Sequence, residues 1–262
     1  MFDALYISES GLSSQQKLID VISNNIANMS TVGFKKSNVN FVDIVVQSEQ
    51  VNTQNSTDLI NEANKTIQGI GVSVGSVNVD HSAGTIKQTG NPLDLAVNGI
   101  GFFEVLQDDG GLAYSRSGRF QVDADGFIAT PDGLKLNSDI RIPPDTEQLS
   151  ITADGVVSVL VPGEDGLVEL GEIELVRFNS PSQLQAIGEG VYQATDASGD
   201  PTYGQPGELG LGDLIQGATE MSNVSMNEEM VNLMMAQRGY QLNARILQVS
   251  DQMMETINNL RR

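Results

Sequence analysis

Cysteine and tryptophan are absent from the 262-residue chain, and histidine occurs only once, as His81. The lack of cysteine excludes disulfides, thiolate metal sites and cysteine nucleophiles. One histidine excludes, within one chain, metal centres that need two or three imidazoles. A Ser-His-Asp triad would depend on His81, which lies in a polar Val-Asp-His-Ser-Ala-Gly stretch without a nucleophile elbow. We therefore interpret His81 as an ordinary surface or turn residue and expect no enzyme.

Basic residues are also scarce, with 14 Lys and Arg against 34 Asp and Glu, for a formal net charge of −20. Because phosphates would be repelled, the balance argues against nucleic acid or an anionic membrane as a partner. No stretch approaches the roughly 18 apolar residues of a membrane span. The first residues, Met-Phe-Asp-Ala-Leu-Tyr, lack a basic segment followed by an apolar run, so we expect no Sec-type signal peptide and no direct membrane insertion.

The N-terminal region, residues 1 to about 29, is predicted to be a helix that ends near Gly33. Its apolar residues recur at seven-residue intervals, and each of the last two is followed three positions later by another apolar residue. The seven-residue series is Leu5, Leu12, Ile19 and Ile26, and the added residues are Ile22 after Ile19 and Met29 after Ile26. This is an a/d-like seam over about four heptads, and it is weakest at Ser8 and Gln15.

Residues 34–89 are polar and rich in Asn, Gln, Ser and Val, with weak periodicity. We interpret them as an extended connector with short strands or a loose helix around 57–65. Residues 90–219 follow as a β-rich outer domain, because short runs such as Gly-Phe-Phe-Glu-Val-Leu and Val-Val-Ser-Val-Leu-Val are typical of strands.

Frequent Asp-Gly pairs separate these strand-like runs. The pairs are Asp109-Gly110, Asp125-Gly126, Asp132-Gly133, Asp154-Gly155 and Asp165-Gly166. Asp-Gly accepts the positive φ angles of tight hairpins, so this density predicts an antiparallel sandwich or irregular barrel. Much of the acidic charge lies in this region, which we therefore expect to face solvent.

The last region is the clearest helix, predicted from a capping box at Ser225 and Glu228 to about Leu260. One apolar stripe consists of Met235, Leu242, Ile246, Val249, Met253 and Leu260. A second, displaced around the axis, consists of Met226, Met230, Leu233, Tyr240, Leu247 and Met254. A helix with two stripes needs neighbours on more than one side. Gly239 lies within the pattern and favours close packing or a bend.

The two long helices lie at opposite ends of the chain and bracket the β-rich region. We expect residues 1–33 and 220–262 to pair as a coiled-coil-like base, in an α+β protein with a central antiparallel β domain. Pairing with further copies through contacts that do not close would generate a helical filament or tube. The alternative is a single-chain helical hairpin packed against the flank of the β domain. The expected interface comprises Leu5, Leu12, Ile19, Ile22, Ile26, Met235, Leu242, Ile246, Val249, Met253 and Leu260.

Ligand chemistry finds little support in the sequence. Asp123-Ala124-Asp125-Gly126 resembles the start of a calcium loop, but position 12 is Leu134 instead of Glu, which favours a hairpin turn. Gly99-Ile100-Gly101 lacks the third glycine and following helix of a dinucleotide fingerprint. We expect no metal and no cofactor. An extracellular acidic β module that binds Ca²⁺ stays open as an alternative function.

Three motifs in order resemble the flagellar basal-body rod protein family. The first is Ser-Asn-Asn-Ile-Ala-Asn-Met-Ser-Thr-Val-Gly-Phe-Lys-Lys at 23–36, with Asn24, Asn25, Asn28, Gly33 and Phe34 as its characteristic residues. The second is Gly-Asn-Pro-Leu-Asp-Leu-Ala-Val-Asn-Gly-Ile-Gly-Phe-Phe at 90–103. The third, at 217–240, contains Ser222, Asn223 and Val224 and ends in Ala-Gln-Arg-Gly-Tyr.

Within that family the resemblance is closest to the distal-rod subunit, with a departure at about residues 45–80, where proline is absent. A proximal-rod or hook-type paralogue therefore remains an alternative. The resemblance implies a structural subunit that polymerises into a helical tube, transmits motor torque to the hook and serves as an export channel.

The resemblance also implies partners and a location. The partners would be further copies of the chain, proximal rod and hook or junction proteins, and the rings that surround the rod. The location would be the basal body where it crosses the periplasm, reached through the flagellum's own type III apparatus.

Overall fold

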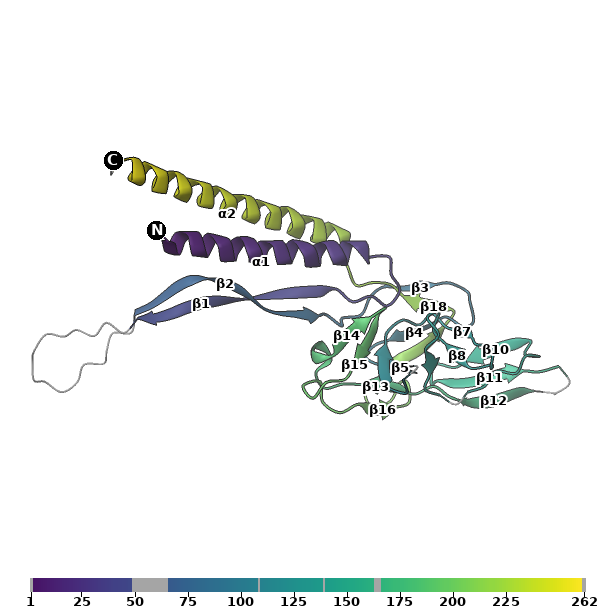
Figure 1. The fold of residues 1–262 in the computed structure, drawn as a ribbon. Coiled ribbons are helices and arrows are strands. Elements are labelled where there is room, and N and C mark those ends of the chain that lie inside the picture. Colours follow the sequence, from purple (N-terminus) through teal and green to yellow (C-terminus); the bar gives the residue numbers. More distant parts are fainter. Residues whose placement is uncertain (1, 49–65, 108, 139, 163–165, 261–262) are drawn as a thin grey trace, which may run out of the picture. The chain divides into compact units, whose positions relative to one another are not determined.

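The computed structural model describes residues 2–48, 66–107, 109–138, 140–162 and 166–260, which form two compact units (Figure 1). The helical unit takes in residues 1–24, 37–78 and 226–262, and the β unit takes in residues 25–36 and 79–225. Each unit is therefore assembled from segments far apart in the sequence. A helix at each end and a central antiparallel β region confirm the predicted α+β class.

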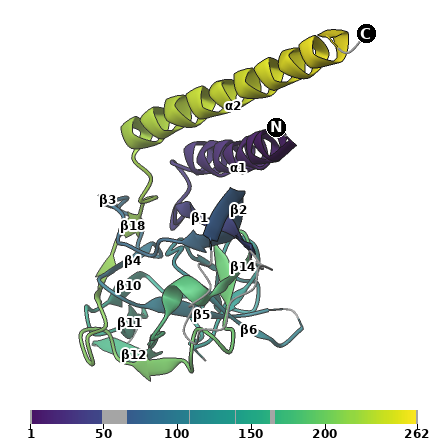
Figure 2. The same ribbon diagram turned by 90° about the vertical axis from the view of Figure 1, so that its left-hand side faces the viewer.

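The long helices are α1 (Phe2–Ala27) and α2 (Met226–Leu260). Helix α2 begins directly after Ser225, as the capping box predicts, and carries Glu228 and Glu229 in its first turn, where acidic side chains complement the helix dipole. The two helices run in opposite directions (Figures 1 and 2).

Reciprocal glycine contacts mark where α1 and α2 approach one another. A Cβ atom on Gly11 of α1 would lie 2.6 Å from Nδ2 of Asn243 on α2. A Cβ atom on Gly239 of α2 would lie 3.2 Å from Cδ of Gln15 on α1. Each helix thus offers a glycine to an amide side chain of the other. The close packing that Gly239 suggested is present, and it is matched by Gly11.

A two-stranded sheet of β1 (Ser37–Ser48) and β2 (Thr66–Val79) completes the helical unit. Serines join it to α1: Ser14 Oγ donates to the Val72 carbonyl at 3.3 Å, and the Val72 N–H donates to Ser10 Oγ at 3.4 Å. The strands are longer than the short ones expected of a connector. The stretch 57–65, where a loose helix was an option, lies outside the described residues.

The β unit contains sixteen short strands and a single 3₁₀ turn, Pro181–Gln183, among its described residues. The strands are β3 (Ile86–Gln88), β4 (Leu95–Asn98), β5 (Phe102–Leu106), β6 (Leu112–Ser115), β7 (Gln121–Val122), β8 (Ile128–Ala129), β9 (Lys135–Leu136), β10 (Gln148–Ile151), β11 (Val156–Leu160), β12 (Leu167–Glu172), β13 (Leu175–Arg177), β14 (Gln185–Gly188), β15 (Val191–Gln193), β16 (Thr202–Gly204), β17 (Asp213–Gln216) and β18 (Ala218–Glu220).

The largest sheet runs β14-β15-β6-β5-β9-β8-β7, with β13 joining β5 to β16. A three-stranded sheet, β10-β11-β12, and the pairs β17-β4 and β18-β3 complete the unit, and the ladders within it are antiparallel. Four of the predicted Asp-Gly turns are confirmed by positive φ angles at Gly110, Gly126, Gly133 and Gly155. The fifth, at 165–166, falls partly outside the described residues.

Central strands of the large sheet are buried on both faces. Phe103 and Leu175 point into the main core cluster, whereas their neighbours Phe102 and Val176 point into a second cluster with Tyr192. Alternate residues of a strand face opposite sides, so these runs read as continuous apolar sequence. Of the family motifs, the second contributes to both clusters: Leu95, Val97 and Phe103 belong to the main one and Phe102 to the other.

Candidate functional site

The segments that carry the family motifs meet inside the β unit. Strand β18, in the third motif, pairs with β3, which directly precedes the second motif. The Gly33 N–H donates to the Glu220 carbonyl at 2.8 Å, and the Lys36 N–H donates to Asn223 Oδ1 at 2.8 Å. The first and third motifs, nearly two hundred residues apart, are therefore joined by backbone and side-chain hydrogen bonds.

A buried ion cluster lies at this junction. Glu220 accepts from Lys35 Nζ at 2.7 Å and from Arg116 Nε at 2.5 Å, and the three side chains are almost completely buried. Arg116 also donates to the carbonyls of Val97, Gly99 and Gly101. Because buried charges are stable only when paired and hydrogen-bonded, this cluster fixes the loops it contacts.

The charged groups of the cluster shift one another's pKa values. Burial lowers the pKa of Lys35, opposed chiefly by the hydrogen bond and charge of Glu220. Burial alone would raise the pKa of Glu220, but Arg116, Lys35 and the Gly84 N–H outweigh it, so the pKa is lowered. Glu220 is therefore the anion that holds two cations in place.

The ion cluster is a functional feature that sequence analysis missed. Lys35 and Glu220 stand within motifs, but nothing in the sequence pairs positions 35, 116 and 220. Arg116 lies outside the motifs, directly after β6. The only available signal was a glutamate in the small, uncharged context Gly-Ala-Thr-Glu-Met-Ser, where a solvated face is not expected.

The predicted motif residues have definite structural roles. Gly33 has φ of 71°, and a Cβ atom there would lie 2.6 Å from the Ser117 nitrogen, so only glycine fits. Asn223 Nδ2 donates to the Asp80 carbonyl at 2.8 Å and to Ser82 Oγ at 3.0 Å. Ser222 Oγ accepts from the Val224 N–H at 3.2 Å.

The remaining motif residues lie at the end of α1 and just after it. Asn25 is buried and Asn24 is exposed. Asn28 accepts from the Thr31 hydroxyl at 3.2 Å, and the Phe34 N–H donates to the Thr31 carbonyl in the turn that Gly33 shapes.

His81 is not the surface residue that its polar sequence context suggested. It is half-buried, with its ring centroid 5.3 Å from that of Phe102 and 5.0 Å from that of Tyr192. Burial and the nearby Lys35 and Arg116 lower its pKa to about 4, against weaker opposing effects of Asp80 and the Pro181 backbone. The ring therefore stays neutral near pH 7. The apolar neighbours come from distant strands, so the local sequence could not reveal them.

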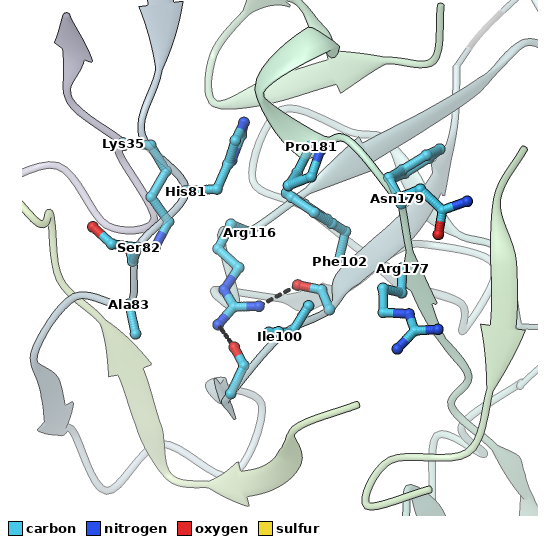
Figure 3. A pocket seen from close by; sticks show the side chains of 13 residues that line it. Lys35, His81, Ser82, Ala83, Ile100, Phe102, Arg116, Arg177, Asn179 and Pro181 are labelled. Carbon is cyan, nitrogen blue, oxygen red and sulfur yellow. Dashed lines mark hydrogen bonds between the residues drawn. The ribbon is translucent and has the colours of Figure 1, made fainter. Parts of the chain in front are cut away.

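Beside His81 lies a cavity of about 720 Å³ within the β unit (Figure 3). Its polar walls come from Lys35, His81, Arg116 and Arg177, and its apolar walls include Phe102 and Pro181. Arg116 extends from below His81 toward the carbonyls of the β4–β5 loop (Figure 3). The junction is thus both a structural clamp and one wall of a cavity.

The expected interface residues of α2 are all exposed in the single chain. The exposed fractions are 65% for Met235, 61% for Leu242, 49% for Ile246, 47% for Val249, 47% for Met253 and 83% for Leu260. By contrast, Glu229, Ala236 and Ser250 are the residues of α2 described as buried. The helix therefore buries small and polar residues and exposes its apolar stripe.

Helix α1 is arranged differently from its predicted seam. Ile22 is buried, but Leu5, Leu12, Ile19 and Ile26 are only half-buried. Ser8 and Ser14 are buried, and Gln15 faces Gly239, so polar residues that weaken the heptad pattern lie within the packed face. A small side chain allows closer approach than a leucine would, which the apolar pattern alone could not indicate.

The acidic turn at 123–126 is paired with a lysine. Lys135 Nζ lies 3.7 Å from Asp123 Oδ2 and 3.5 Å from Asp125 Oδ2. Gly126 has a positive φ and its N–H donates to the Asp123 carbonyl, which is the hairpin turn that the sequence favoured over a calcium loop. Within the described residues, no group of three or more potential metal ligands is assembled, and no helix is long and apolar enough to span a membrane.

Three family models match the chain in order. They are the flagella basal body rod protein at residues 5–35, the flagellar hook protein FlgE/F/G D1 domain at 96–159, and the flagellar basal body rod FlgEFG protein C-terminal region at 215–260. The first and last of these contain the two sequence motifs that meet at the ion cluster. Because these three models match successive parts of the chain, the chain is a protein of the flagellar rod and hook class.

Similarity to individual proteins shows which member of this class the chain resembles along its whole length. The flagellar basal-body rod protein FlgG of Buchnera aphidicola subsp. Schizaphis graminum is 40% identical over 261 residues, covering 99% of this chain and 100% of the relative. FlgG of Bacillus subtilis is 39% identical over 267 residues, covering 100% of both. The flagellar hook protein FlgE of Borreliella burgdorferi is 33% identical over 202 residues, covering 76% of this chain but 45% of the hook protein.

The chain belongs to the family of the flagellar basal-body rod protein FlgG, because its similarity to FlgG runs from end to end of both chains. The resemblance that the sequence motifs indicated is confirmed.

Proposed function

We propose that the chain is a structural subunit of the flagellar rod, which polymerises with further copies into a helical tube. The tube transmits motor torque to the hook and serves as an export channel. The proposal joins the family membership to one observation on the structure, the exposed apolar stripe of α2.

That stripe is the strongest physical argument for assembly. Six apolar side chains at helical spacing, from Met235 to Leu260, are each about half or more exposed. Monomeric proteins rarely leave a continuous apolar stripe in water, because each such side chain gains about 1.5–3 kcal/mol when it is buried. A second copy of the chain is the partner that a polymer supplies.

Helices α1 and α2 are proposed to form a coiled-coil-like base that neighbouring copies complete. The contacts through Gly11 and Gly239 hold the pair together without using the α2 stripe. The stripe then remains available for intermolecular packing, together with the half-buried seam of Leu5, Leu12, Ile19 and Ile26 on α1. Interlocked apolar helices resist twisting, which suits a shaft under torque.

The β-rich region 90–219 is proposed to be the outer domain of the tube, with a sandwich-like or irregular-barrel core. Residues 34–89, of which 37–78 belong to the helical unit, are proposed to link this domain to the assembly segments 1–33 and 220–262. An acidic exterior discourages adhesion to a surrounding ring, since like-charged or strongly hydrated surfaces do not associate.

The remaining partners and the location are proposed from the family. They are proximal rod subunits, hook or junction proteins and the rings around the rod, in a basal body that crosses the periplasm. Export through the flagellar type III apparatus is likewise proposed from the family.

Replacing Leu242 and Val249 together by Asp tests the assembly role of the α2 stripe. We expect the critical concentration for assembly to rise by more than about 100-fold, because burial of the two side chains contributes about 3–6 kcal/mol per subunit. Sedimentation velocity over a concentration series measures this, and circular dichroism checks that the β unit stays folded.

A matched control places the same charges one position away. Gln241 and Gln248 precede the two apolar residues and are already exposed and polar, so Gln241→Asp with Gln248→Asp should assemble like the unsubstituted chain within about threefold. Equal assembly by the two double variants would contradict the proposed role of the stripe.

A further inference from the structure

Basic side chains are few in this acidic chain, yet several gather in one place. Lys35, Arg116 and Arg177 all line the cavity of about 720 Å³ beside His81. None of the thirteen described residues that line it is acidic (Figure 3). Glu220 lies behind the wall, where it pairs with both Lys35 and Arg116. One carboxylate thus balances two cations, and the cavity wall keeps a net positive charge.

Hydrogen-bond donors in the cavity are not all used. Arg177 Nη1 donates to the Leu209 carbonyl at 2.9 Å, and no carboxylate of the described residues lies within 4 Å of its guanidinium nitrogens. The half-buried Arg177 guanidinium has five N–H donors, more than one carbonyl uses, and this favours a ligand with carboxylate oxygens.

The apolar walls of the cavity also fit the methylene groups of an aspartate or glutamate side chain. Ile100 is 58% exposed at the rim, and Phe102, Phe178 and Pro181 form apolar surface next to Arg177. A carboxylate would reach Arg177, whose planar guanidinium matches it in a two-point contact, while its methylene groups contact these apolar walls.

We propose that this cavity receives an acidic side chain from a second copy of the chain. The inference rests on the proposed polymerisation and assigns it a second contact, distinct from the α2 stripe. With 34 acidic residues and a net charge of −20, copies of this chain repel one another. Seating a carboxylate of one copy in the basic cavity of the next sets opposite charges together, and such contacts fix the register of an interface.

Charge reversal at the rim tests the contact, because Arg177 lies outside the Glu220 cluster. We expect Arg177→Glu to raise the critical concentration for assembly of the full chain about tenfold or more. Arg141→Glu is the matched control: Arg141 is exposed, belongs to the same unit and also donates to one backbone carbonyl, that of Asp125. It should change the critical concentration less than about twofold.

The substitution Arg177→Lys allows the contact between position 177 and a carboxylate to be detected by chemical cross-linking. The lysine keeps the charge and introduces a primary amine that a carbodiimide couples to a neighbouring carboxylate. In an assembled mixture of isotope-labelled and unlabelled chains, we expect mass spectrometry to find position 177 joined to an Asp or Glu of the other copy. Arg141→Lys should give little of this product.

The outcomes separate the two proposals. Equal assembly by Arg177→Glu and Arg141→Glu, or coupling of position 177 only within its own chain, would overturn the cavity contact and leave assembly through α2 intact. Failure of the unsubstituted chain to assemble at any concentration would overturn both.

Discussion

Glu220 is the shared acceptor of the buried ion cluster in the β unit. It pairs with Lys35 and Arg116 and also accepts from the Gly84 N–H at 2.6 Å, so its carboxylate joins three separate segments. Replacing a buried pair by apolar residues is often harmless, but removing one partner leaves a charge buried without compensation. Here two charges would be left.

The substitution Glu220→Gln tests this. We expect it to lower the free energy of unfolding of the β unit by about 3–5 kcal/mol, since Lys35 and Arg116 lose their only counterion in the cluster. Denaturant unfolding followed by near-ultraviolet circular dichroism measures the change. Glu208→Gln, at an exposed acid of the same unit, should change it by less than about 0.5 kcal/mol. Similar effects of the two substitutions would show that Glu220 is not the centre of the junction.

His81 predicts how stability depends on pH. Its pKa falls from 6.5 to about 4 in the folded chain, so the unfolded chain binds the proton more readily between those values. The contribution of His81 to the free energy of unfolding is therefore fully present above pH 6.5. It decreases by about 3 kcal/mol as the pH falls toward 4. Glu220, whose pKa is also lowered, adds a further loss only below about 4.5.

Replacing His81 by Phe removes the proton site and keeps an aromatic ring between Phe102 and Tyr192. We expect Phe at this position to flatten the decline in melting temperature between pH 6.5 and 4.5. Proton NMR of the sole histidine gives its pKa directly. An ordinary pKa near 6.5, or an unchanged decline in the variant, would contradict the buried, neutral ring.

At the scale of elements, the sequence predicted the helices well and their packed faces less well. The capping box predicts the start of α2. Its first apolar stripe is exposed, and so are Met226, Met230 and Tyr240 of the second stripe. On α1, the apolar pattern predicts a seam through Leu5, Leu12 and Ile19. In the structure, Ser8 and Ser14 are buried instead, and Gly11 lies against Asn243. Hydrophobic periodicity detects apolar contact, and it misses faces where small residues allow backbones to approach.

The β1–β2 sheet was only partly foreseen. Its strands carry exposed apolar side chains at Phe41, Val42, Val45 and Val46, so the alternation that marks a half-buried strand is lacking. In the sequence, a segment with apolar residues on both faces and polar residues between them has no clear strand periodicity, so it is interpreted as a connector. The long strands became visible only once their pairing was known.

The glycine contact between the helices predicts a packing variant. Gly11→Leu would drive a branched side chain into Asn243, so we expect it to destabilise the helical unit by about 1–3 kcal/mol. Hydrogen exchange of α1 and α2 amides measures the loss of protection. Ser13→Leu, at an exposed position of the same helix, is the control and should leave protection nearly unchanged. Equal protection in the two variants would mean that the helices do not meet at Gly11.

At the scale of the whole molecule, the three motifs were visible in the sequence because each is a short local pattern. The ion cluster and the basic cavity were not, because they depend on positions 35, 116, 177 and 220 coming together through strand pairing. The α+β class follows from periodicity at the two ends and turn density between them. The division into two units does not, since both units combine distant segments.

The central claim is that other copies of the chain pack against the exposed apolar stripe of α2 and bury it. Negative-stain electron microscopy of the concentrated, unsubstituted chain tests it most directly. We expect tubes or fibres of uniform width, which vanish when Leu242 and Val249 are replaced by Asp. A field of single particles at every concentration, or equal tubes from that variant, would contradict the account.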